Sequence, residues 1–204
     1  MTPPRTTGLL LAAGAGTRMG RPKALVRAAD GTPWTVRAAT TLLDGGCDDV
    51  LVVLGAAASE AEPLLAGLHG VRTVVAPDWA QGLGASLTSG LADLAVSEPP
   101  VEAALVSLVD LPGLPSAAVR RVLGPRAGRG TAARRAAFAA GPGHPVLLGR
   151  AHWDTLAAHL RAAASDPSSA DRGAGAYLRS VGADTVACDD LWQGDDQDTP
   201  LPIR

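Results

Sequence analysis

Apolar residues along this chain form short unbroken runs, which are separated by longer stretches with helical spacing. The run Val50-Leu51-Val52-Val53-Leu54 contains no polar residue, and such a run is typical of a strand buried on both faces of a parallel sheet. Strands that alternate with helices indicate βαβ units with right-handed crossovers. The pattern predicts strands over 7–13, 49–55, 71–76 and 103–109, and helices over 34–44, 59–68 and 83–96.

The pattern changes after residue 123, where the predicted elements become shorter. The length of 204 residues predicts one α/β domain over residues 1–204, and the sequence contains no internal repeat. In its second half we predict a Gly/Arg turn at 125–130, strands at 132–139, 145–148 and 184–188, helices at 150–164 and 173–181, a polar loop at 165–171 and a surface loop after residue 192.

Composition narrows the class of protein. Hydrophobic residues make up 47% of the chain and aromatic residues only 3%, so we expect a core of Ala, Val and Leu. The formal net charge is -2, whereas a general nucleic-acid-binding protein is usually basic. We therefore expect no nucleic-acid partner.

Cysteine usage and the start of the chain bear on the compartment. Cys47 and Cys188 are far apart in the sequence, which fits a reducing compartment and neither a disulfide framework nor a zinc motif. The first apolar run is followed at once by cations and is too short to span a bilayer. We expect a cytoplasmic protein with no membrane partner.

A glycine-rich segment, residues 14–23, follows the first predicted strand and is called the glycine loop below. Gly14 and Gly16 allow backbone N–H groups to approach a ligand closely, and phosphates bind such amide arrays. The loop holds three cations within six residues, and one of them, Lys23, is the only lysine among 18 basic residues. An ammonium is a compact point charge that arginine does not reproduce.

Two common phosphate motifs are excluded for the glycine loop. The chain has no Gly-x-x-x-x-Gly-Lys-Ser/Thr string, and Met19 occupies the position where a dinucleotide fingerprint needs a third small residue. What remains is a different phosphate site, with Arg18 and Lys23 as its cations. The alternative interpretation is a tight turn with solvated surface charges.

Asp110 comes directly after a predicted apolar strand, in the sequence Val109-Asp110-Leu111-Pro112. The carboxyl ends of strands are where open α/β sheets bind ligands. One or two carboxylates together with substrate phosphates are a common Mg²⁺ site. The alternative is a turn or N-cap aspartate that binds no metal.

Two further segments hold candidate polar residues. The acidic tail around Asp198 is either a solvated loop or the source of a second carboxylate for the same Mg²⁺. His144 lies in Gly141-Pro142-Gly143-His144-Pro145, between rigid turn residues and ahead of an apolar run. It either positions an acceptor substrate by hydrogen bonding or is a loop histidine with no ligand.

Together these segments resemble one known family. The glycine loop with the preceding strand resembles the signature of nucleotidyltransferases that transfer NMP from an NTP. The wider pattern is similar to the molybdenum cofactor cytidylyltransferases of the NTP-transferase superfamily, which are related to the guanylyltransferases. The matching segments are 11–23, 77–91, Asp110-Leu111-Pro112, 143–146 and 196–200.

The resemblance implies a fold and a role for each matching residue. The fold is a three-layer α/β sandwich with a mainly parallel sheet, of the nucleotide-diphospho-sugar transferase-like (Rossmann-like) type. Nucleotide binding falls in about 1–114 and acceptor binding in about 115–204. Implied nucleotide-binding residues are Leu11, Ala12, Ala13, Gly14, Ala15, Gly16, Thr17, Arg18, Lys23, Pro77 and Ser86; catalytic residues are Arg18, Lys23 and Asp110; metal ligands are Asp110 and Asp198; acceptor-binding residues are His144, Pro145, Asp171 and Arg172.

The implied reaction is transfer of CMP from CTP to the terminal phosphate of molybdenum cofactor, with Mg²⁺ as cofactor and release of pyrophosphate. Ala13, where guanylyl-transferring relatives carry Gly, favours cytidine over GTP. Gly175 stands where the family often has Arg, which leaves a sugar or alcohol phosphate open as acceptor. A nucleotide-binding regulator without turnover is a further alternative. A third alternative, compatible with catalysis, is a partner-binding chaperone that delivers the cofactor to a molybdoenzyme, so a molybdoenzyme or its chaperone is a candidate partner.

Overall fold

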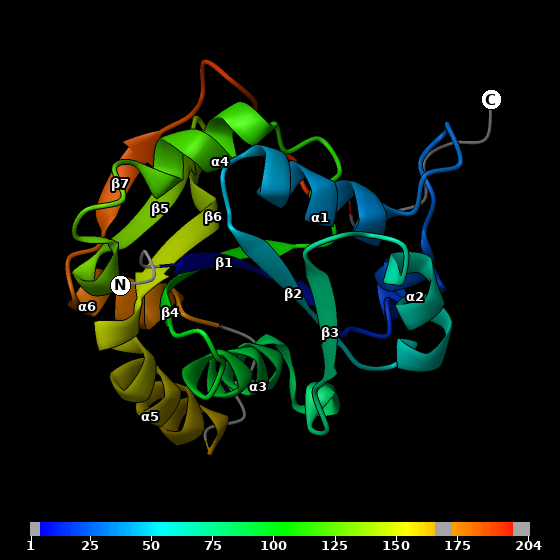
Figure 1. Cartoon of the computed structure of the whole chain (residues 1–204), viewed down its shortest axis with the longest axis horizontal. Helices are drawn as coiled ribbons and strands as arrows, with labels where there is room; N and C mark the ends of the chain where they lie inside the picture. Colours follow the sequence, from blue (N-terminus) through cyan, green and yellow to red (C-terminus); the bar gives the residue numbers. More distant parts are fainter. Residues whose placement is uncertain (1–4, 166–172, 198–204) are drawn as a thin grey trace.

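A seven-stranded sheet forms the centre of the computed structural model, which describes residues 5–165 and 173–197, apart from the side chain of Arg18. The strands follow the order β3-β2-β1-β4-β6-β5-β7 across the sheet (Figure 1). Their bounds are β1 Arg5–Ala12, β2 Asp49–Leu54, β3 Val71–Val75, β4 Val101–Leu108, β5 Ala133–Phe138, β6 Gly141–Gly149 and β7 Asp184–Ala187.

The sheet is mainly parallel, as the sequence predicts. β1 pairs in parallel with β2 and β4, and β2 pairs in parallel with β3. Only β6 is antiparallel to its neighbours β4 and β5 within the described residues, while β7 is again parallel to β5. The carboxyl ends of β1 and β4 therefore meet the amino end of β6 at one edge of the sheet.

Helices cover both faces of the sheet, which confirms the three-layer sandwich. The cluster of buried residues on one face draws on α1, α2 and α4, and the cluster on the other face draws on α3, α5 and α6 (Figure 1). The helices are α1 Trp34–Asp44, α2 Ala58–Leu65, α3 Leu83–Ala95, α4 Ser116–Leu123, α5 Trp153–Ala164 and α6 Gly175–Ser180.

Each central strand contributes side chains to both clusters. Along β1, Leu9 and Leu11 pack on the face of α3, whereas Leu10 and Ala12 pack on the face of α1. Successive side chains of a strand point to opposite faces, so an unbroken apolar run is what a sheet covered on both sides requires. This is the physical reason that the runs without alternation predicted the sheet correctly.

The first part of the chain matches the predicted elements to within about two residues at most boundaries, but β6 begins earlier than predicted. The Gly-Pro-Gly-His-Pro segment reads as a turn, yet β6 includes it because Gly141 and Pro142 pair with Phe138 and Ala137 of β5. A short 3-10 helix, η5 (Arg150–His152), also precedes α5. Tertiary pairing has here overridden local propensity.

Three simpler expectations can also be compared with the structure. Cys47 and Cys188 are both buried and unpaired, in agreement with the absence of a disulfide framework. None of the helices in the described part of the chain has the length and apolar character needed to cross a membrane. The predicted polar loop at 165–171 lies almost wholly outside the described residues.

Candidate active site

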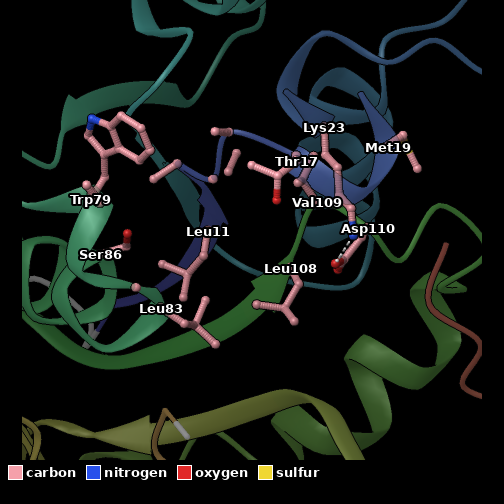
Figure 2. Close-up of a pocket in the computed structure, with 17 residues that line it drawn as sticks. Leu11, Thr17, Met19, Lys23, Trp79, Leu83, Ser86, Leu108, Val109 and Asp110 are labelled. Carbon is pink, nitrogen blue, oxygen red and sulfur yellow. Dashed lines mark hydrogen bonds and ion pairs between the residues drawn. The ribbon is translucent and has the colours of Figure 1, made fainter. Parts of the chain in front are cut away.

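A cavity of about 460 Å³ opens at the carboxyl edge of β1 and β4 (Figure 2). Its lining comes from the end of β1, the glycine loop, the segment that leads into α3, and the end of β4. The lining residues are Leu11, Ala12, Ala13, Gly14, Ala15, Gly16, Thr17, Met19, Lys23, Trp79, Ala80, Gly82, Leu83, Ser86, Leu108, Val109 and Asp110. Segments predicted separately from the sequence therefore meet in one place.

The glycine loop is shaped to present backbone amides to this cavity. Gly16 has φ 62°, and a Cβ at this position would overlap the carbonyl oxygen of Arg21, so only glycine fits. Met19, in the 3-10 helix η1 (Thr17–Met19), is buried in the core and anchors the loop. The N–H groups of Gly14, Ala15 and Gly16 donate no hydrogen bond to any described residue, as expected of an anion-binding array.

Lys23 and Asp110 form an ion pair at the carboxyl end of β4. Lys23 begins the 3-10 helix η2 (Lys23–Leu25), and its Nζ lies 2.8 Å from Oδ2 of Asp110. The two side chains are only 15% and 19% exposed, so solvent screens the pair less than it would a surface pair. Figure 2 shows both side chains at the same end of the cavity.

The second carboxylate oxygen of Asp110 provides a test of the metal prediction. Oδ1 is buried and has no hydrogen-bond partner in the described part of the protein. A buried carboxylate oxygen without a partner is costly, and a divalent cation would satisfy it. Residues 5–165 and 173–197 hold no group of three His, Cys, Asp or Glu side chains arranged for a metal, so the fit is to an ion that substrate phosphates also coordinate.

The acidic tail passes next to this carboxylate. The backbone N–H of Gln197 donates to the carbonyl oxygen of Asp110 at 2.9 Å. Asp198, the predicted second metal ligand, follows Gln197 directly in sequence but lies outside the described residues. Its role as a metal ligand remains a prediction. The hydrogen bond from Gln197 places the described end of the tail beside Asp110, the other predicted ligand.

The opposite end of the cavity is formed by Ser86 and Trp79 (Figure 2). Ser86 is buried on α3 and lines the cavity, and its contact with a nucleotide stays a prediction. Trp79 lies in the 3-10 helix η3 (Trp79–Gln81), and its ring packs where a Cβ on Gly55 would come within 2.6 Å of it. Pro77, another predicted nucleotide-binding residue, is exposed and does not line the cavity.

Trp79 is a functional candidate that sequence reasoning missed, although it stood in a matching segment. The signal was available, because the chain has only four tryptophans and 3% aromatic residues. A large aromatic side chain in a segment between a strand and a helix suggests a binding surface, since a flat ring offers a stacking face to a base.

A second cavity of about 200 Å³ adjoins the first and shares Leu11 and Leu83 with it. His144 lines it, and its Nδ1–H donates to the carbonyl oxygen of Val106 at 3.3 Å. Burial lowers the pKa of His144, and the Val106 carbonyl opposes that shift only in part. The imidazole is therefore neutral at pH 7.

The other predicted acceptor-binding residues are less well placed or not described. Pro145, next to His144, is buried and lines neither of these two cavities. Asp171 and Arg172 lie outside the described residues, as does the side chain of Arg18. Gly175, at the start of α6, lines the second cavity.

These features define a class of protein. An amide array, a lysine–aspartate pair and an adjoining second cavity at the carboxyl edge of a mainly parallel sheet fit a nucleotidyltransferase site. Residues 8–183 match the model of the MobA-like NTP transferase domain, and the chain belongs to that family.

Two similar proteins match this chain over nearly its whole length. The chain is 40% identical, over 96% of its length and 93% of the relative, to nicotine blue oxidoreductase of Paenarthrobacter nicotinovorans. Rv0371c of Mycobacterium tuberculosis has a similar crystal structure, with a TM-score of 0.74 and 27% identity over 97% of this chain and 95% of that one. Its manganese complex gives a TM-score of 0.66 and 25% identity over 98% and 92%.

Proposed function

We propose that this protein transfers CMP from CTP to the terminal phosphate of molybdenum cofactor and releases pyrophosphate, with Mg²⁺ as cofactor. The observation that carries the proposal is the buried Oδ1 of Asp110, which has no hydrogen-bond partner among the described residues and lies beside Lys23. The glycine loop lines the same cavity as this pair, and a second cavity adjoins it. This arrangement would provide one place for a triphosphate and another for an acceptor.

The nucleotide would lie along the first cavity. Its phosphates would accept hydrogen bonds from the amides of the glycine loop and would contact Lys23, whose charge opposes theirs. The base and ribose would reach the other end, where the Trp79 ring offers a stacking face and Ser86 a hydroxyl group. We infer this orientation from the charges, because Lys23 and Asp110 lie together at one end of the cavity, where the triphosphate and its metal would bind.

Asp110 would hold the divalent metal through Oδ1, with Asp198 as a second ligand from the tail. When bound, Mg²⁺ would neutralise phosphate charge and orient the nucleotide. The manganese complex of Rv0371c supports a divalent ion in a protein of this fold. Lys23 would then exchange part of its contact with Asp110 for contacts with the phosphates.

The reaction needs no general base from the protein. An oxygen of the acceptor's terminal phosphate, already anionic near neutral pH, would form a bond to the α-phosphorus of CTP. The bond from that phosphorus to the β-phosphate oxygen would break, and its electrons would leave with pyrophosphate. Lys23 would stabilise the charge that develops on the leaving group, and the two cavities would align the reactants.

Two residues bear on substrate choice. Ala13 lines the nucleotide cavity and favours cytidine, with GTP as the alternative. Gly175 leaves open space in the acceptor cavity, since the nearest atom to a Cβ there would be a guanidinium nitrogen of Arg179 at 3.7 Å. A sugar or alcohol phosphate is the alternative acceptor.

A redox function is the second candidate, because the 40% identity to nicotine blue oxidoreductase covers nearly the whole chain. An enzyme of that kind needs an electron donor. The cavity would then hold the donor in place of an NTP. The glycine loop lacks the dinucleotide fingerprint, which favours the transferase.

One pair of assays separates these candidates. Pyrophosphate release is measured with Mg²⁺ and molybdenum cofactor for CTP, GTP and ATP, and oxidation of NADH and NADPH is measured with nicotine blue. Release with CTP alone supports the proposal, and release with GTP corrects the base. Dinucleotide oxidation without any pyrophosphate release would overturn the proposal in favour of the redox function.

A further inference from the structure

The floor of the second cavity is built by alternate residues of two paired strands. His144, Val146 and Leu148 of β6 line it, which is the period of side chains on one face of a strand. Arg135 of β5 is the register partner of Val146 and lines the same cavity. The pairing slips between Arg135 and Ala137, and such a bulge often re-aims a side chain beside a functional site.

Arg135 has an unmet hydrogen-bonding requirement in this cavity. Its Nε is buried and has no hydrogen-bond partner in the described part of the chain. The neighbouring Arg134 is different, because it donates to the carbonyl oxygen of Leu123 at 3.2 Å and lies 3.9 Å from a carboxylate oxygen of Asp184. A buried donor without a partner is unfavourable, so a ligand that supplies an acceptor oxygen would stabilise the site.

His144 supplies a hydrogen-bond acceptor to the same cavity. Its Nδ1–H is committed to the Val106 carbonyl, so in the neutral ring Nε2 keeps a lone pair and accepts a hydrogen bond. His144 stands two residues before Val146, the register partner of Arg135, and the side chains of His144 and Arg135 line the same cavity. The cavity is therefore lined by one donor and one acceptor between apolar walls.

We propose that Arg135 and His144 recognise the lactam edge of a planar heterocycle, which forms the head of the acceptor substrate. The ring carbonyl oxygen would accept from Nε–H of Arg135, and the adjacent ring N–H would donate to Nε2 of His144. The inference rests on the proposed function, in which the other end of the acceptor carries the reacting phosphate. Arg135 is thereby a specificity-determining residue of the acceptor site.

The apolar walls favour a flat ring over a phosphate at this position. Leu11, Val106 and Leu178 line the cavity, and its volume is about 200 Å³, which suits one small ring system. A phosphate would bring only acceptor oxygens, and the lone pair of His144 would repel them. A lactam edge satisfies both polar groups at once.

The test is the affinity of the whole protein for two small fluorescent rings. Pterin, 2-amino-4-oxopteridine, has the carbonyl and N–H edge, whereas 2,4-diaminopteridine reverses it to an amino group and a ring nitrogen. We expect wild-type protein to prefer pterin by about 10- to 100-fold, the effect of losing a hydrogen bond to a charged group. Arg135→Met should reduce that preference, because only the contact with His144 then remains, and the matched control Arg134→Met should keep it.

Each outcome is decisive. Equal affinity for the two rings in wild-type protein overturns the inference without any variant. Competition by inorganic phosphate that disappears in Arg135→Met would make this an anion site and also overturn it. Pyrophosphate release from CTP is measured separately, so a protein that turns over CTP but ignores the ring edge refutes the lactam assignment alone. Discrimination between the rings without turnover refutes the proposed reaction alone.

Discussion

Nζ of Lys23 lies 2.8 Å from Oδ2 of Asp110, and this contact joins residues that are 87 positions apart in the chain. Lys23 ends the glycine loop, and Asp110 follows the last residues of β4. The pair therefore fixes the loop against the edge of the sheet. It also leaves one face of the carboxylate available, because Oδ1 has no partner among the described residues.

Replacement of Lys23 should damage turnover far more than folding. We expect Lys23→Met to lower the rate of CTP-dependent pyrophosphate release by about 10²–10³-fold, the usual effect of losing one electrostatic group at a reacting centre. The methionine keeps the apolar length of the side chain, so thermal unfolding should still be cooperative. Turnover and melting temperature are measured on the same protein.

The control for this variant is Arg27→Met. Arg27 is an exposed cation that donates to the carbonyl oxygen of Gly31 and does not line the cavity. Its loss should leave turnover within about twofold of wild type, since surface substitutions have small effects. A Lys23→Met enzyme that works at the full rate would remove Lys23 from the catalytic machinery.

Replacement of Asp110 should act through the metal. Asp110→Asn keeps the shape of the side chain but removes its charge, so we expect it to abolish Mg²⁺-dependent pyrophosphate release and to weaken Mn²⁺ binding by at least tenfold. Metal titrations followed by calorimetry and by activity check both effects. The matched control is Asp93→Asn, whose partner is Arg72 on the surface and which lies away from the cavity. Unchanged metal curves for Asp110→Asn would contradict the site.

The sequence predicted which segments form this site, but not the contacts between their side chains. Unbroken apolar runs predicted β1 and β4, and both strands end at the same edge because they are parallel neighbours. That rule places the glycine loop near Asp110. The ion pair itself depends on the exact reach of one side chain after the loop has folded, which no local pattern encodes.

Two residues were missed for a related reason. Trp79 and Arg135 become significant only through tertiary neighbours, namely Gly55 for the first and the β5–β6 register for the second. In sequence Arg135 stands beside Arg134, and nothing distinguishes the two. The structure separates them, because one meets partners on its own face of the sheet and the other faces a cavity.

Gly55 should prove necessary for the position of Trp79. A Cβ at Gly55 would lie 2.6 Å from the Trp79 ring and 2.5 Å from the carbonyl oxygen of Ala13, so Gly55→Ala must displace one of them. We expect a loss of about 1–3 kcal/mol in the free energy of unfolding, as for other overpacked sites, and a raised KM for CTP. Denaturant titration and steady-state kinetics measure the two effects.

Gly67→Ala provides the comparison for that variant. No atom lies within 4 Å of a Cβ at Gly67, and its φ is not in the left-handed region. The substitution should leave both stability and the KM for CTP close to wild type. Equal behaviour of the two alanine variants would show that Trp79 does not need the space beside Gly55.

The neutral state of His144 should appear in the pH dependence of stability. Burial lowers the pKa of His144 in the folded chain below 6.5, the ordinary value that applies to the unfolded chain. Between the folded and the unfolded pKa values, the unfolded chain binds a proton that the folded chain does not. The free energy of unfolding should therefore fall as pH falls below 6.5, with a slope of at most about 1.4 kcal/mol per pH unit. Above pH 6.5 this contribution is complete.

His144→Gln should flatten that slope, and His69→Gln, which removes an exposed histidine, controls for the loss of an imidazole. Protonation of His144 should also weaken acceptor binding, because a protonated imidazole can no longer accept a hydrogen bond at Nε2. The KM for the acceptor should rise as pH falls through the lowered pKa of His144 in the folded protein, which lies below 6.5, while the KM for CTP stays level. A CTP KM that rises in parallel would mean that the acid effect lies in the nucleotide cavity, and His144 would lose its assignment to the acceptor.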